Sequence, residues 1–147
     1  MQIRIKNHIQ LDGHTELIDQ VYDTDWTQKG DFHYLLYKNE EGEKVVLKFH
    51  DKELVMTRFS EPKSIMRFIS QGQALVGIHT PVGLQQFVTD TPFYKVDFTK
   101  QVLQLHYQLK TVDGEQIFAS YEWRLAGVNC YSPRKLLKII MFPLAKA

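Results

Sequence analysis

The sequence predicts an all-β domain, an antiparallel up-and-down meander of about 8–10 strands that closes into a barrel. Turn signals such as Asp12-Gly13, Glu41-Gly42 and Asp113-Gly114 recur along the 147-residue chain. Between them, apolar residues alternate with polar ones, which is typical of a sheet with one solvated face. No connection before residue 126 is long enough for a crossover helix, so neighbouring strands are expected to be antiparallel.

The first and a late strand show this alternation most clearly. In IRIKNHIQL, residues 3–11, the isoleucines and the final leucine share one face. In QVLQLHYQL, residues 101–109, the leucines and Tyr107 do the same. A period of two is the strand signal, and each segment is therefore expected to turn one apolar face toward a core.

Closure into a barrel is predicted because a meander must otherwise leave two edges exposed. A two-sheet sandwich is the alternative. Three segments, residues 32–38, 54–59 and 74–78, carry apolar residues on both faces. Their outer faces are expected to be covered by the C-terminal tail or by a partner chain, or to reflect a flattened barrel.

Residues 1–126 are predicted to form one domain, and residues 127–147 a basic and apolar tail that is not a separate domain. Pro133 suits the first turn of a short tail helix. That helix is expected to pack on the barrel or across its open end, with contact to a membrane surface or a partner as the alternative. The tail carries basic residues and no acidic ones, which leaves the body mildly acidic and argues against a nucleic-acid partner.

The expected location is the cytoplasm. Cys130 is the single cysteine, so no intrachain disulfide can form. The first residues hold no apolar run typical of a signal peptide, and no stretch approaches the ~20 apolar residues of a spanning helix.

Several segments resemble the YwiB-like family of uncharacterised bacterial proteins. They are ELVMTRF, IMRFISQG, IHTPVG and the late pair LHYQL and DGEQIFASYEWRL, and the similarity runs from residue 2 to about Leu125. The resemblance implies a calycin-like (lipocalin-like) barrel and brings no activity, cofactor or catalytic residue. The family commonly has glycine after the arginine at position 58, whereas this chain has Phe59-Ser60.

Arg58 and Arg67 are the main candidates for a binding site. A hairpin with the four-residue loop 61–64 would place them directly opposite each other, with Met56 opposite Ile69. Two cations on an apolar face need an anion between them, so this set is a candidate clamp for a carboxylate or phosphate. The alternatives are a register that turns the arginines outward, or pairing with acids such as Glu16 or Glu122.

Other motifs point to structure more than to chemistry. The segment His79-Thr80-Pro81-Val82-Gly83 predicts a turn, or else a loop at the barrel mouth that gates entry. The histidine spacings match no metal motif, no GxSxG serine elbow occurs, and Asp19, Asp23 and Asp25 are expected to form a solvated edge. No metal, cofactor or catalytic residue is therefore expected.

The functional prediction is a non-enzymatic barrel that binds a small apolar or anionic amphiphilic ligand inside. The alternative is an interaction module with a filled barrel, which acts through its apolar outer faces and basic tail and forms a possible homodimer. The aromatic residues, 12% of the chain, are expected to fill the interior.

Overall fold

The computed structural model describes residues 1–128, which form eleven β-strands in two antiparallel sheets. The strands are β1 (Gln2–Leu11), β2 (His14–Asp23), β3 (Asp25–Lys29), β4 (Phe32–Lys38), β5 (Lys44–Phe49), β6 (Glu53–Arg58), β7 (Ser64–Ile69), β8 (Gly72–Thr80), β9 (Gly83–Asp97), β10 (Val102–Thr111) and β11 (Ile117–Val128). The predicted all-β class is confirmed, and no helix occurs within the described part of the chain. The predicted tail helix lies outside the described residues.

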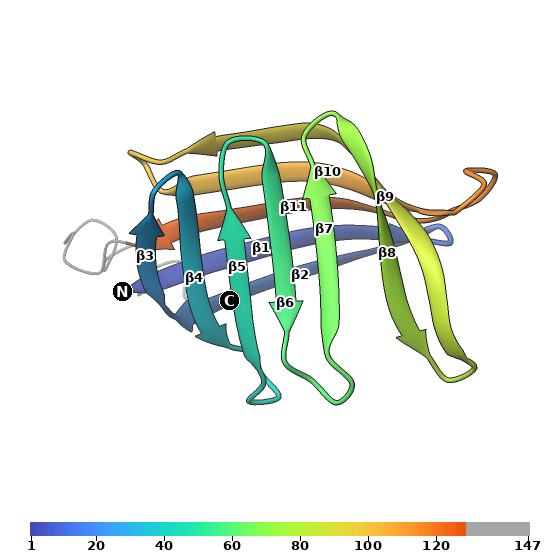
Figure 1. Ribbon diagram of the computed structural model, residues 1–147, viewed down its shortest axis with the longest axis horizontal. Helices are drawn as coiled ribbons and strands as arrows, with labels where there is room; N and C mark the ends of the chain where they lie inside the picture. The colour runs from blue at the N-terminus through green and yellow to red at the C-terminus, as the bar shows by residue number, and fades with distance from the viewer. Residues whose placement is uncertain (129–147) are drawn as a thin grey trace, which may run out of the picture.

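The strands stack as a sandwich rather than a closed barrel. One sheet has the order β2-β1-β11-β10-β9-β8, and the other β3-β4-β5-β6-β7. Figure 1 shows the five-stranded sheet lying across the six-stranded one, with the strands of the two sheets crossing steeply. The prediction of closure was therefore wrong, and the sandwich that stood as its alternative is the observed arrangement.

The ring of neighbouring strands is interrupted at two corners. At the first corner, Thr24 connects β2 to β3. Its amide donates to the Met1 carbonyl at 2.9 Å, and its hydroxyl donates to the Leu36 carbonyl at 2.8 Å. At the second, between β7 and β8, the Gln71 amide donates to the Thr91 carbonyl at 2.8 Å. Isolated hydrogen bonds satisfy the backbone at these corners, so the sheet does not need to continue through them.

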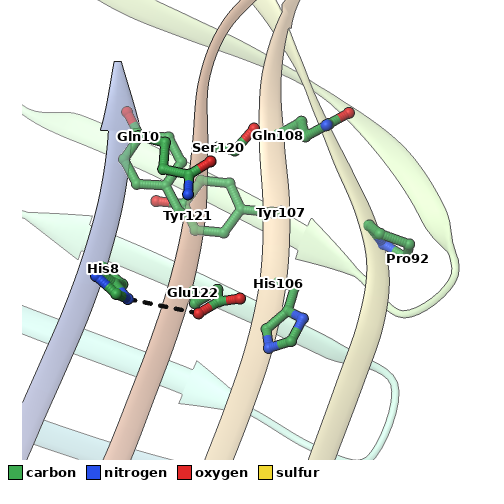
Figure 2. A pocket seen from close by; sticks show the side chains of 9 residues that line it. All are labelled: His8, Gln10, Pro92, His106, Tyr107, Gln108, Ser120, Tyr121 and Glu122. Carbon is green, nitrogen blue, oxygen red and sulfur yellow. Dashed lines mark ion pairs between the residues drawn. The ribbon is translucent and has the colours of Figure 1, made fainter. Parts of the chain in front are cut away.

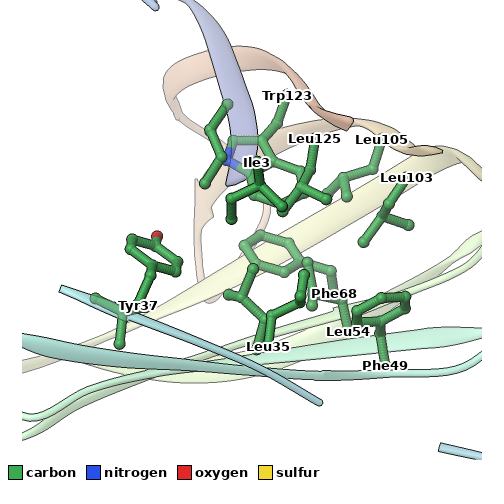
Figure 3. Packing of buried hydrophobic residues seen from close by; sticks show 13 residues of the cluster. Ile3, Leu35, Tyr37, Phe49, Leu54, Phe68, Leu103, Leu105, Trp123 and Leu125 are labelled. Carbon is green, nitrogen blue, oxygen red and sulfur yellow. The ribbon is translucent and has the colours of Figure 1, made fainter. Parts of the chain in front are cut away.

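The core lies between the two sheets. Figure 3 shows side chains from both sheets meeting there. The predicted apolar faces reach the core at Ile3 and Ile5 of β1 and at Leu103 and Leu105 of β10. The end of β1 differs from the prediction, because Leu11 is exposed. Residues with no exposed surface include Ile3, Leu35, Leu47, Phe49, Leu54, Leu103, Leu105 and Leu125. The predicted role of the aromatic residues as core is confirmed for Phe49, Phe68 and Trp123. It is wrong for Phe59, Phe93 and Phe118, which are exposed.

Tyr94 links the sheets at one end of this core. Its hydroxyl, carried by β9, donates to the backbone carbonyls of His50 at 2.6 Å and Glu53 at 2.9 Å. His50 lies in the connection between β5 and β6 of the other sheet, and Glu53 is the first residue of β6. Burial raises the pKa of the Tyr94 hydroxyl, so it remains a donor at neutral pH.

Candidate functional site

The predicted interior clamp does not form, because the β6–β7 register differs from the prediction. Arg58 lies opposite Ser64, and Arg67 lies opposite Val55. This shift of three residues places Arg67 on the outer face of the sheet, while Arg58 ends β6 at the rim of the sandwich. Arg67 Nε lies 3.2 Å from Glu53 Oε1, and Arg58 Nε lies 3.9 Å from Glu43 Oε1.

The connection between β6 and β7 differs from the prediction. Arg58 pairs with Ser64, so residues 59–63 form the loop in place of the predicted residues 61–64. The Phe59 amide donates to the Lys44 carbonyl at 2.8 Å and continues the β5–β6 ladder. Met56 consequently faces Met66 rather than Ile69. Met56 packs against the core, whereas Ile69 lies opposite Glu53 on the outer face, so the four predicted ligand-binding residues are not brought together.

The predicted mouth loop is the tip of the β8–β9 hairpin. Thr80 pairs with Gly83, and the Thr80 hydroxyl donates to the Gly83 carbonyl at 2.8 Å. Gly83 has a φ of 116°, which favours glycine, and His79 and Pro81 are exposed. Because residues 1–128 form two sheets rather than a barrel, this turn has no barrel mouth to gate.

A cleft of about 240 Å³ lies on the outer face of the six-stranded sheet, and Figure 2 shows the side chains that line it. Register explains its position. His8, Glu122 and His106 form one row across β1, β11 and β10, and Gln10, Ser120 and Gln108 form the next. Ser120 is small and stands between two glutamines, so the hollow opens above it.

The cleft is lined by side chains that can form hydrogen bonds, but it is open to solvent. His8 Nδ1 lies 3.7 Å from Glu122 Oε2, and both side chains are about half exposed or more, which makes this a surface ion pair of small energetic value. The His106 ring lies 4.7 Å from that of Phe93. Across residues 1–128, no group of three or more His, Cys, Asp or Glu side chains is placed to hold a metal ion.

An exposed apolar face occupies the outer side of the β8–β9 hairpin. We call Leu75, Val82, Leu84 and Val88 the hairpin face. Leu75 lies directly opposite Val88. Leu84 lies over Gly77, where an added Cβ would stand 3.2 Å from Leu84 Cδ1. Leu75 is 58% exposed, Leu84 63% and Val82 82%, so apolar area remains uncovered by residues 1–128.

Residues 3–125 match the family model described as "Domain of unknown function (DUF1934)". The chain belongs to the DUF1934 family. No curated protein matches it. Among solved structures, the DUF1934 chain is similar to the crystal structure of the ywiB protein from Bacillus subtilis, with a TM-score of 0.65 and 18% identity over 87% of this chain and 91% of that one. The predicted YwiB-like resemblance is confirmed, and at this identity the structural match establishes the fold alone.

One feature of this DUF1934 chain was not anticipated from its sequence, and a second was anticipated only in part. His8 and His106 were placed on polar faces, but their approach to Glu122 depends on β1 pairing with β11, a contact between the two ends of the domain. The hairpin face had a visible signal, since residues 74–78 are apolar on both faces. In the described part of the chain, no helix is long and apolar enough to cross a membrane.

Proposed function

We propose that this protein is a non-enzymatic interaction module that self-associates as a homodimer through the hairpin face. The supporting observation is the contrast between a filled interior and an exposed apolar exterior. Core residues such as Leu47, Phe49 and Leu105 occupy the space between the sheets, while Leu75 and Leu84 remain more than half exposed. Exposed apolar patches rimmed by polar residues are typical of interaction sites.

The charge pattern favours a second copy as the occupant. The residues of β8 and β9 that point outward around the hairpin face are Gln73, His79 and Gln86, and none carries a fixed charge. Asp90, at the end of this face, is paired with Lys110 at 2.7 Å. Two such faces can meet around a two-fold axis without like-charge repulsion, as a symmetric homodimer interface requires.

An enclosed ligand has less support. The two arginines expected to bind its anionic group instead form ion pairs with two different glutamates, Glu43 and Glu53. The order of strands, with β1 beside β11, supports an opened form of a calycin-like barrel whose interior is packed. We propose a cytoplasmic location, where the thiol of Cys130 would stay reduced.

The test is the mass of the full chain in solution by native mass spectrometry and light scattering. The wild type is expected to be a dimer. Leu75→Lys and Leu84→Lys are expected to give monomers, because each would bring two charges into a symmetric apolar interface. Leu17→Lys is the matched control, since Leu17 is 61% exposed on β2, at the opposite edge of the same sheet, and the dimer should persist.

A monomeric wild type would contradict the proposal, and so would equal effects of all three substitutions. A co-purified mass of lipid size in the wild type would instead support the enclosed-ligand function. Circular dichroism of each variant separates loss of the interface from loss of the fold, because an exposed substitution should leave the strand signal unchanged.

A further inference from the structure

We propose that the outer face of the five-stranded sheet binds single-stranded nucleic acid. This basic face consists of the outward residues of β3 to β7, among which the lysines and arginines outnumber the acids. Register and alternation assign to it Lys29, Lys38, Lys44, Lys48 and Arg67 as basic residues and Asp25 and Glu53 as acidic ones. Figure 1 shows this sheet in front of the other, so the face is not covered by the six-stranded sheet.

The positive charge of this face is largely uncompensated. Glu53 is paired with Arg67, but none of the four lysines forms an ion pair with any residue in the range 1–128. Lys38 and Lys44 lie directly opposite each other on β4 and β5. Like charges in this position repel, and a bound anion would relieve the repulsion.

Aromatic rings lie among these lysines. Phe32 and Tyr34 are neighbours on the outer face of β4, and Lys48 Nζ lies 4.5 Å from the Phe32 ring centroid and 6.0 Å from that of Tyr34. Lys29 Nζ lies 5.9 Å from the Tyr34 centroid on the other side. Rings on a sheet face flanked by basic side chains are the arrangement on which bases stack while phosphates meet the cations.

A third ring extends the same face toward its other end. Phe59 is 45% exposed, with Lys44 Nζ at 5.1 Å and Lys63 Nζ at 5.3 Å from its centroid. Exposed cation–π contacts are weak relative to base stacking, so a base can displace an ammonium, which then moves to a phosphate. The basic face therefore presents two platforms at its two ends, which suits an extended strand.

The mildly acidic composition of the body does not exclude this ligand. Net charge is an average over the chain, whereas association depends on the local field of the surface that meets the ligand. The fold collects the lysines of β3, β4 and β5 on one face. A duplex would keep its bases stacked inside, so the exposed rings favour a single strand.

The test is fluorescence anisotropy of a labelled oligouridylate of about 10 nucleotides with the full chain at low salt. We expect binding that weakens with salt. Lys48→Ala and Lys44→Ala should each weaken it and lower the salt slope by about one. Tyr34→Leu should weaken it about tenfold with an unchanged slope, because it removes stacking and keeps the charges. Lys95→Ala, on the outer face of the other sheet, should bind as the wild type does.

Four results would overturn the proposal. The first is no binding at low salt, and the second is an equal loss of affinity in Lys95→Ala. The third is that inorganic polyphosphate, anionic phospholipid vesicles or a duplex of the same length competes as well as the single strand. The fourth is that Lys135→Ala/Lys138→Ala, in the tail, abolishes binding while Lys48→Ala does not. Unchanged thermal midpoints of the Lys48→Ala and Tyr34→Leu variants show that the fold is retained.

Discussion

The free energy of unfolding is expected to depend on pH through His33. Its Nδ1 accepts a hydrogen bond from Trp26 Nε1 at 2.9 Å, and its ring stacks on Phe98 at 4.2 Å. Burial lowers the pKa of His33, because the charged form loses water. The unfolded chain therefore binds this proton more readily than the folded one. Its contribution to the free energy of unfolding is fully present above the ordinary pKa of about 6.5 and is lost as pH falls below it.

His33→Asn should reduce this pH dependence, because the amide oxygen can accept the Trp26 hydrogen bond and cannot titrate. Urea unfolding at pH values of about 7.5 and about 5.5 measures the change in the free energy of unfolding between these conditions. The loss of unfolding free energy on acidification should be smaller in His33→Asn than in the wild type. Equal losses in the two proteins would show that His33 is not the group responsible.

The arginines show where inference at the level of single residues stops. Both lie on adjacent strands, as predicted, but the predicted facing pair depended on the exact length of one loop. The loop between β6 and β7 spans residues 59–63, and the pairing shifts by an odd number of residues, which moves Arg67 to the opposite face from Met56. This difference in register removes a binding site that was otherwise consistent with the sequence.

Two threonines on β9 give a matched test of how the corner between β7 and β8 is held. Both are fully buried. The Thr89 hydroxyl donates to the Arg67 carbonyl on β7 at 2.6 Å, whereas the Thr91 hydroxyl has no hydrogen-bond partner within residues 1–128. Thr89→Val should lower the free energy of unfolding by about 0.5–1.5 kcal/mol, since it removes a hydrogen bond to a partly buried carbonyl. Thr91→Val should be neutral or stabilising, because it removes an unpaired buried hydroxyl.

Urea denaturation of the two variants and the wild type measures both effects. The two substitutions are chemically identical and lie two residues apart on one strand, so differences in β propensity and volume cancel. An equal loss in both variants would indicate that packing, rather than the hydrogen bond to β7, determines the effect.

At the level of strands, local pattern was sufficient for the two elements with the clearest alternation. Ile3 and Ile5 of β1 and Leu103 and Leu105 of β10 are buried, as their alternation predicted. The register between β1 and β11 could not be predicted in the same way, because no short turn connects them. The cleft at His8 depends on that register, and so it emerged only from the structure.

At the level of the whole molecule, the sequence predicted the order of neighbours but not their closure. Every strand pairs with its neighbour in sequence except at the two corners, and β1 meets β11 as it would in a barrel. At the corners, the hydroxyls of Thr24 and Thr89 donate to backbone carbonyls of the five-stranded sheet, and neither residue is part of a turn motif that the sequence shows. The sheets separate there, and the apolar residues between them can then pack directly against each other.

This packing predicts that stability is concentrated between the sheets. Leu105 has no exposed surface, so Leu105→Ala should lower the free energy of unfolding by about 2–5 kcal/mol through lost burial and a residual cavity. Leu17, on the edge strand β2, is 61% exposed, and Leu17→Ala should change the free energy of unfolding by no more than about 0.5 kcal/mol. Urea unfolding of the two variants checks the difference. A loss below about 1 kcal/mol for Leu105→Ala would mean that the interior is loosely packed, and the enclosed-ligand function would then regain support.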